Sequence, residues 1–264
     1  MNEAVIFLAA PTVMCFILAG IHCYLGLHVL ARGVIFVDLS LAQVAAFGAT
    51  AALLFGYEHN TVAGYCFSLG STLIAAALFA LARKQEKIFS QEAIIGIVYA
   101  LSSAAVVLLV EHLAHGAEHI KELLVGQILW VSWPTVAKTA AIYSAVGLIH
   151  YIFRKELLAA SFGGVHKTRW DFLFYALFGV VITSSVSIVG VLQVFAYLIV
   201  PSIVSTLFYT SIRSRLLFGW LLGIVLSVVG MWLSYTFDLP SGAFLVVCFA
   251  SIPILMLLAA PFRR

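Results

Sequence analysis

Most of this chain lies in long intervals that contain no Asp, Glu, Lys or Arg. These intervals are residues 4–31, 39–57, 59–82, 93–110, 139–153, 172–212, 216–237 and 239–262. About 20 apolar helical residues cross a bilayer core that is about 30 Å thick. Hydrocarbon offers the backbone no hydrogen-bond partner, so each crossing segment has to satisfy its own peptide groups, as an α-helix does. The interval 172–212 is long enough for two spans, and we expect a break near Ser187–Gly190, where small residues interrupt it. The pattern predicts an all-α, polytopic membrane protein with eight or nine transmembrane helices in one domain, residues 1–264.

The composition excludes several classes of protein. Hydrophobic residues make up 64% of the chain and charged residues 9%, and the mean hydropathy is +1.13. Soluble domains are about 45–50% apolar and about 25% charged, so this chain has too few charges to coat a soluble surface. The net charge of +3 is too small to indicate a nucleic-acid partner. A soluble enzyme, a nucleic-acid-binding protein and a disordered chain are therefore excluded, and the lipid bilayer is the expected surrounding.

The basic residues predict the orientation. Loops at 83–87, 154–169, 213–215 and 263–264 hold most of the Lys and Arg residues. Cytoplasmic loops are enriched in these residues, so we expect those four segments inside the cell and the N-terminus outside. The first residues lack a basic region and a cleavage site, so we interpret the first apolar stretch as a span rather than a removed signal peptide.

The motifs of common enzymes are absent from the sequence. GxxxxGK[ST], HExxH and GxSxG do not occur, which argues against nucleotide binding, zinc-dependent hydrolysis and serine hydrolysis by this chain. The four cysteines lie in apolar stretches without a CxxC pair, which argues against a disulfide framework and a zinc ribbon. We expect no catalysis by this chain.

Asp38 is the main candidate for a functional group inside the membrane. An ionisable side chain there is costly unless it faces a cavity or a partner. Asp38 shares a helical face with small residues such as Ala45 and Ala49, and the alternative to a transport role is an ion pair with Arg32. Gln43 lies about 140° around the helix, so both side chains reach one cavity only if the helix is distorted or the cavity is broad.

Two histidines and a glutamate are further candidates. His22 lies in the first span, where a neutral imidazole could bind zinc, manganese or iron, or could be a hydrogen-bonded packing residue. His28 lies nearer Arg32, where an interfacial position explains it equally well. Glu92 opens the span over 93–110, and a stabilising carboxylate at a helix N-terminus is the favoured interpretation.

The interval 172–212 and the outer loop carry the remaining candidates. Pro201 is expected to kink its helix and free a carbonyl group, and Gln193 and Tyr197, four residues apart, could line a transport path. The outer loop holds several potential metal ligands that could collect a metal, with a solvated loop as the favoured alternative: His112, His115, Glu118 and His119.

Five segments occur together in one order along the chain, namely residues 32–48, 92–98, 123–131, 190–201 and 238–242. In this combination the sequence resembles the integral-membrane permeases of bacterial zinc, manganese and iron ABC importers. The resemblance runs from about His28 to Gly242. It implies that two copies of the permease pair with cytoplasmic ATPase subunits and an extracytoplasmic metal-binding protein in a prokaryotic plasma (inner) membrane. ATP would be used by the ATPase subunits, the divalent metal would be cargo, and this chain would hold no cofactor.

The resemblance also implies roles for individual residues. Structural or coupling roles fall on Glu92, Pro201, Asp238, Pro240, Gly242, Arg154 and Lys155, the last two at the start of a cytoplasmic coupling loop at about 154–171. Permeases for zinc or manganese usually carry Asp-x-x-x-His in the second span. When the segments are aligned on Gly48, Gln43 takes the histidine position and Leu39 the aspartate position, with Asp38 one residue earlier. The 154–171 loop is also shorter than the family's.

These observations favour a permease subunit of an ABC importer that moves zinc, manganese or iron by alternating access. Asp38 is the first candidate for guiding the cation, with Gln43, His22 and His28 as further participants. The alternative is a stand-alone secondary carrier or channel for a metal or another small solute, without an ATPase.

Overall fold

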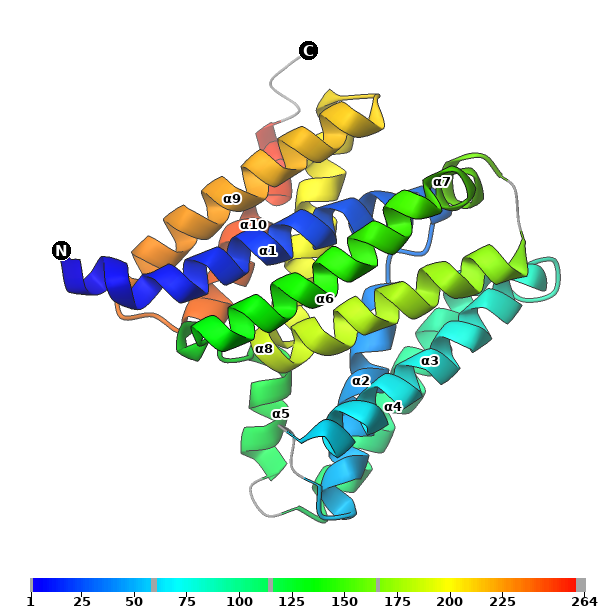
Figure 1. Cartoon of the computed structure of the whole chain (residues 1–264), viewed down its shortest axis with the longest axis horizontal. Coiled ribbons are helices and arrows are strands. Elements are labelled where there is room, and N and C mark those ends of the chain that lie inside the picture. The colour runs from blue at the N-terminus through cyan, green and yellow to red at the C-terminus, as the bar shows by residue number, and fades with distance from the viewer. Residues whose placement is uncertain (1, 58–60, 114–115, 165–166, 260–264) are drawn as a thin grey trace.

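The computed structural model describes the chain except residues 1, 58–60, 114–115, 165–166 and 260–264. The described residues form helices and connecting turns (Figure 1). In chain order the helices are α1 (Asn2–Arg32), α2 (Val37–Leu54), α3 (Val62–Lys84), α4 (Gln91–Val110), α5 (Gly116–Val125), the 3-10 turn η1 (Ile128–Trp130), α6 (Trp133–Ile152), α7 (Arg154–Phe162), α8 (Thr168–Phe208), α9 (Ile212–Thr236) and α10 (Ser241–Ala259). The predicted all-α class is confirmed.

The helices are long and apolar enough for a multi-pass membrane protein. Among the described residues, seven helices qualify as spans, or eight when α6 and α7, which meet at an 81° bend, are taken as one broken span. Many large apolar side chains face outward, for example Ile97 and Leu101 on α4 and Leu255 on α10, each at least 60% exposed. Such surfaces suit lipid and would be unfavourable in water.

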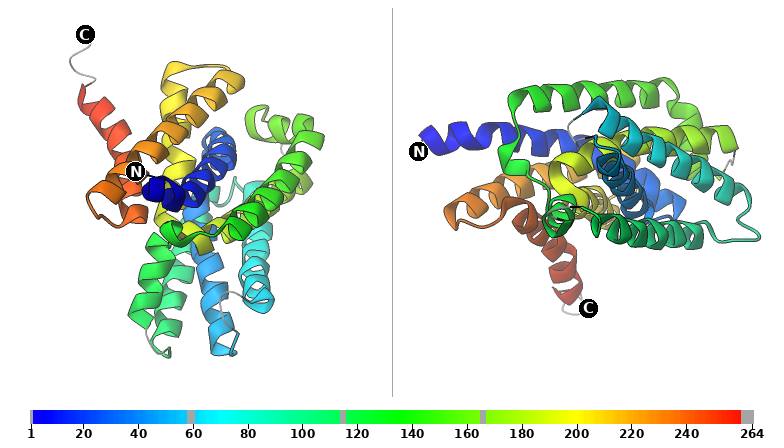
Figure 2. Two further views of the ribbon diagram at one scale, coloured as in Figure 1. Left: turned by 60° about the vertical axis from the view of Figure 1, so that its left-hand side comes forward. Right: turned by 90° about the horizontal axis from the view of Figure 1, so that it is seen from below.

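Helix α8 lies at the centre of the fold. It contacts α1, α2, α3, α5, α9 and α10, and it carries fully buried aromatic side chains such as Phe174, Phe178 and Tyr197. Its two limbs run in different directions on either side of a break (Figures 1 and 2). The break is at Gly190, whose φ of 77° and ψ of 165° are not helical. The predicted break near Ser187–Gly190 is confirmed.

The break in α8 is filled by the segment between α5 and α6. The amide N–H of Gln127 donates a hydrogen bond to the carbonyl of Ile188 at 3.0 Å, just before the break. The α-carbons of Gly126 and Gly190 lie so close that a methyl group on either would overlap the other segment's backbone, and a methyl group on Gly242 would overlap the carbonyl of Val125. Three of the five segments that carried the family resemblance therefore meet at this break.

The kink expected at Pro201 stays a prediction. Pro201 lies inside α8 with helical backbone angles, and Gly190 is the position inside α8 that departs from them. Pro201 packs against two glycines of α9, Gly219 and Gly223, which are spaced as GxxxG. A glycine can adopt a positive φ and so interrupt a helix, whereas the φ of a proline is fixed near the helical value.

Helix α7 occupies the first part of the predicted coupling loop. Its inner face is formed by Leu157, Ala160 and Ser161, all buried, whereas Arg154 and Lys155 are exposed. This spacing gives a short amphipathic helix. The helix ends at Phe162, and α8 begins at Thr168.

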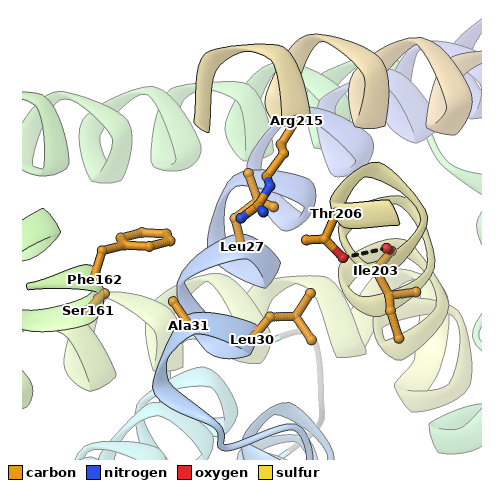
Figure 3. A pocket seen from close by; sticks show the side chains of 8 residues that line it. All are labelled: Leu27, Leu30, Ala31, Ser161, Phe162, Ile203, Thr206 and Arg215. Carbon is orange, nitrogen blue, oxygen red and sulfur yellow. Dashed lines mark hydrogen bonds between the residues drawn. The ribbon is translucent and has the colours of Figure 1, made fainter. Parts of the chain in front are cut away.

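The basic ends of several helices lie together. A pocket of about 440 Å³ is bordered by the end of α1 (Leu27 and Leu30), the end of α7 (Ser161 and Phe162) and Arg215 at the start of α9 (Figure 3). Arg32 and Arg83 lie beside the same end of α7, through bonds to Ser161 and Ala160. Arg83, the end of α7 and Arg215, which the charge pattern places in the cytoplasm, thus lie at one end of the bundle.

We predict that Gly190→Ala lowers the melting temperature of the purified protein. A non-glycine residue in this backbone conformation costs about 1–3 kcal/mol, and the added methyl group would also meet the Gly126 amide and the Leu124 carbonyl. The matched control is Gly147→Ala, where an added methyl group meets no atom within 4 Å and alanine favours the helix. Thermal unfolding in detergent measures both variants, and a Gly190→Ala protein as stable as wild type would contradict this account of the break.

Candidate functional site

Asp38 lies in the first turn of α2 and is 1% exposed. Within the described part of the chain, neither carboxylate oxygen has a hydrogen-bond partner. The ion pair with Arg32, the alternative that the sequence left open, does not form, because Arg32 pairs with Asp171 at 2.7 Å. A buried carboxylate without a partner is unfavourable for stability, so its presence calls for a functional explanation.

Glu92 lies next to this region, at the start of α4. Its Oε1 accepts a hydrogen bond from the backbone N–H of Phe36 at 3.2 Å, just before α2 begins. Phe36 precedes Asp38 by two residues, so this bond holds the Glu92 carboxylate at the end of α2 that carries Asp38. Glu92 therefore stabilises the N-terminal end of α2 as well as opening its own helix, which extends the helix-end role expected from the sequence.

Gln43 lies on a different face of α2 from Asp38. Gln43 and Leu39 are half-buried and lie four residues apart on one side of the helix. The undistorted helix keeps Asp38 on the other side, facing the interior of the fold. The structure thus does not bring the side chains of Asp38 and Gln43 together.

His22 is held in a hydrogen-bonded cluster in the core. Its Nδ1–H donates to the carbonyl of Leu18 at 2.9 Å, and its Nε2 lies 3.1 Å from the Ser185 hydroxyl, which also bonds to Tyr143. The His22 ring meets the Tyr143 ring edge-on, with 6.1 Å between their centres. Both ring nitrogens are occupied, so the geometry matches the packing interpretation of His22.

His28 lies in an aromatic cluster near the end of α1. Its Nδ1 is hydrogen-bonded to the Ser161 hydroxyl at 2.8 Å, and its ring lies 6.0 Å from the ring of His150. Tyr24 lies between them and bonds to Nδ1 of His150 at 3.2 Å. Sequence reasoning missed His150, although an isolated histidine inside an apolar interval was a signal of the same kind as His22.

Gln193 and Tyr197 are fully buried on the second limb of α8. The Tyr197 hydroxyl is hydrogen-bonded to Ser227 of α9 at 2.6 Å, and its ring lies 4.5 Å from that of Phe249 in α10. The Gln193 amide lies near Gly242, beside the break in α8. Tyr197 connects α8 to α9 and α10, whereas the Gln193 amide makes no hydrogen bond to another helix among the described residues. The lining of a transport path by these two side chains stays a prediction.

The segment Asp238–Gly242 connects α9 to α10. Asp238 has a positive φ of 53°, which turns the chain, and the N–H of Leu239 donates to the carbonyl of Ser234 at 2.9 Å. Pro240 is exposed and precedes α10. This tight connection delivers Gly242 to the break in α8, which gives the segment a structural role.

The predicted metal-collecting loop is only partly described. His112 is exposed, and its Nδ1 bonds to the carbonyl of Leu108 at 3.1 Å. His115 lies outside the described residues, as do the side chains of Glu118 and His119, whose backbone belongs to α5. Among the described residues, no group of three or more His, Cys, Asp or Glu side chains is arranged to hold a metal ion.

A cavity of about 580 Å³ opens between α2, α3, α5, α6 and α8. Its lining is mixed: apolar side chains such as Ile142 and Val186 lie beside polar ones that include Tyr65, Ser68, Glu122, Lys138, Thr183 and Ser184. Ala45 and Ala49 of α2 also border it, and they lie on the helical face that carries Asp38 two turns earlier. The small-residue stripe that the sequence predicted on α2 therefore forms one wall of this cavity.

Membrane proteins of known sequence or structure are similar to this chain over most of its length. The manganese transport system membrane protein MntC of Listeria innocua is 29% identical over 80% of this chain and 78% of its own length. An uncharacterized membrane protein of Synechocystis is 28% identical over 94% of this chain and 88% of its own. A chain in the structure of PsaBC from Streptococcus pneumoniae in complex with Fab has the same fold, with a TM-score of 0.75, 22% identity, and coverage of 93% of this chain and 88% of that one.

The family model described as the ABC 3 transport family matches residues 5–260, which include both limbs of α8, the break at Gly190 and the segments that fill it. The chain belongs to the ABC 3 transport family.

Proposed function

We propose that this chain is the permease subunit of an ATP-driven importer for a divalent transition metal, namely manganese, zinc or iron. The observation that carries the proposal is the family match over residues 5–260. Relatives named as manganese transport permeases support the choice of cargo. The chain itself contributes the membrane path and no catalysis.

The proposal includes partners that the importer needs. Two copies of the permease would form the path between them, and cytoplasmic ATPase subunits would hydrolyse ATP, since this sequence has no phosphate-binding loop. An extracytoplasmic metal-binding protein would deliver the cation on the outer side of a prokaryotic plasma membrane. Exposed Arg154 and Lys155 on the amphipathic helix α7 support docking of the ATPase at the basic end of the bundle.

Transport would follow alternating access, in which the binding site opens first to one side of the membrane and then to the other. Asp38 is the proposed group that stabilises the cation, because its buried carboxylate has no side-chain partner among the described residues. A passing divalent cation would compensate this charge for the time that it stays there.

The first test measures uptake by the assembled importer. The permease, its ATPase subunits and the binding protein are reconstituted in liposomes, and uptake of manganese chloride and zinc chloride is followed with and without ATP. We expect uptake only with ATP. Metal uptake by the purified permease alone, without ATPase subunits or ATP, would instead show a stand-alone carrier or channel.

A second prediction concerns Asp38. We expect Asp38→Ala and Asp38→Asn to reduce metal uptake by at least about tenfold, with no loss of thermal stability, because the carboxylate that is removed has no described partner to leave unpaired. Glu86→Gln, at an exposed loop position, is the control. Normal uptake by the Asp38 variants would remove this residue from the path.

A third prediction concerns the outer loop. Joint replacement of His112, His115 and His119 by alanine should raise the external metal concentration needed for half-maximal uptake and leave the maximal rate unchanged, because imidazoles there would act only to gather the cation. Uptake rates across a range of manganese concentrations measure this. An unchanged concentration dependence would make the loop an ordinary solvated segment.

A further inference from the structure

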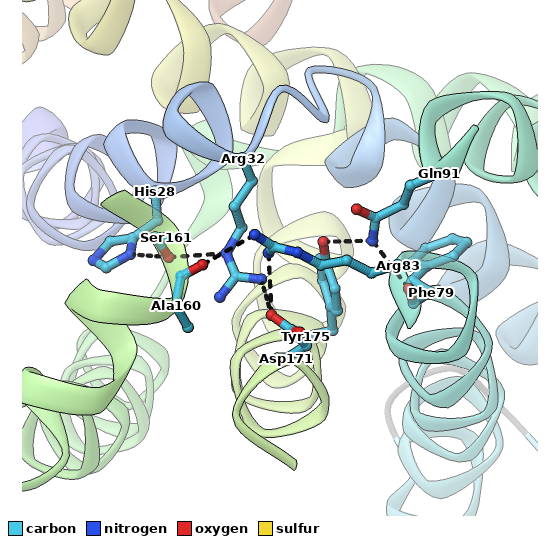
Figure 4. Close-up of polar contacts among 9 residues, drawn as sticks. All are labelled: His28, Arg32, Phe79, Arg83, Gln91, Ala160, Ser161, Asp171 and Tyr175. Atoms are coloured by element: carbon cyan, nitrogen blue, oxygen red, sulfur yellow. Dashed lines mark hydrogen bonds and ion pairs between the residues drawn. The ribbon is translucent and has the colours of Figure 1, made fainter. Parts of the chain in front are cut away.

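A cluster of buried charges lies at the cytoplasmic end of the bundle, where α1, α3 and α8 meet (Figure 4). Arg32 ends α1, Arg83 lies in the last turn of α3, and Asp171 lies in the first turn of α8. One oxygen of Asp171 accepts a hydrogen bond from Arg32 at 2.7 Å and forms an ion pair with Arg83 at 3.1 Å. These side chains are almost fully buried, so water screens their attraction little.

The same two arginines also hold the end of α7. Nε of Arg32 donates to the Ser161 hydroxyl at 2.9 Å, and Nη2 of Arg83 donates to the carbonyl of Ala160 at 3.0 Å. Ser161 in turn is bonded to His28 of α1. Each arginine therefore bonds to α7 with one part of its guanidinium group and to Asp171 with another, and α7 is fixed to three helices through two side chains.

The cluster continues into the membrane-spanning helices. The Arg32 guanidinium lies over the Phe174 ring, 4.1 Å from its centre, and 5.4 Å from that of Tyr175. The Tyr175 hydroxyl accepts a hydrogen bond from Gln91 of α4 at 2.8 Å, and Gln91 also donates to the carbonyl of Phe79 in α3 at 2.9 Å. The polar contacts thus run without interruption from α7 to α1, α3, α4 and α8.

This cluster of charges opposes the separation of α1, α3 and α8 at this end of the bundle but allows the three helices to move together. Pulling one charge out of the cluster would leave another buried without compensation, so the helices that carry these charges tend to move together. On the other side of Ser161 and Phe162, the pocket of about 440 Å³ leaves space between α7 and the start of α9 (Figure 3). Helix α7 therefore has a firm attachment on one side and open space on the other.

We infer that the Arg32–Asp171–Arg83 cluster, together with Ser161, is the joint through which a displacement of α7 is passed to α1, α3 and α8. The inference rests on the proposed function, in which an ATPase subunit docks on α7. The four residues are positioning residues: they contact neither the cation nor ATP, and they set how much helix movement each ATPase cycle produces. Loss of the joint would leave ATP hydrolysis intact and reduce the metal moved per ATP.

The test measures manganese uptake and ATP hydrolysis in the same liposomes, which contain the complete importer. Ser161→Ala removes one bond to α7 and keeps the ion pairs, and Asp171→Asn removes the shared charge. We expect the ratio of metal moved to ATP hydrolysed to fall about threefold for Ser161→Ala and about tenfold for Asp171→Asn. Asp171→Glu, which keeps the charge, should restore part of the ratio.

Ser102→Ala is the matched control, because Ser102 is also buried but its hydroxyl bonds only to its own helix, α4, at Val98 and Tyr99. We expect the wild-type ratio for this variant. If the Asp171 variant fails to assemble, Ser161→Ala alone decides the question. A wild-type ratio in Ser161→Ala and Asp171→Asn, or an equal loss of uptake and hydrolysis, would contradict the inference about the joint. A wild-type importer without ATP-dependent uptake would instead contradict the proposed function.

Discussion

The need to satisfy every backbone group inside the bilayer governs this structure. Helices meet that need within the apolar intervals, and the fold departs from helical geometry inside a span at Gly190 of α8. There the segment after α5 fills the space, and the N–H of Gln127 bonds to the carbonyl of Ile188 at the end of the first limb. The backbones of three segments that are far apart in the sequence therefore meet at the break inside this span. Glycine at positions 126, 190 and 242 leaves the space that this close approach needs.

The buried charges of the chain fall into two groups, which differ in whether a side chain of opposite charge lies beside them. Arg32, Arg83 and Asp171 lie at helix ends, where the one carboxylate pairs with both guanidinium groups, and the two arginines attach α7 to the bundle. Asp38 is also near a helix end, but no described side chain compensates its carboxylate. In a permease of this family, the first arrangement suits transmission of movement, and the second suits transient contact with a cation.

Much of the fold could be predicted from the sequence, because apolar length and charge position act locally. The all-α class and the break near Gly190 followed from such patterns. The site was less predictable, because partners in a membrane bundle come from distant parts of the chain. The sequence offered nearby Asp38 as the ion-pair partner of Arg32. The partner in the structure is Asp171, which lies 139 positions away in the sequence. His150, which shares the aromatic cluster of His28, was missed for the same reason.

The central claim is that this chain carries a divalent transition metal into the cell. The most direct measurement is the manganese, zinc and iron content of cells that lack the permease, grown under metal limitation, compared with cells that carry the wild-type chain. The account predicts that at least one of the three metals falls in the deletion strain and returns with the wild-type chain. Equal contents of all three metals in both strains would contradict it.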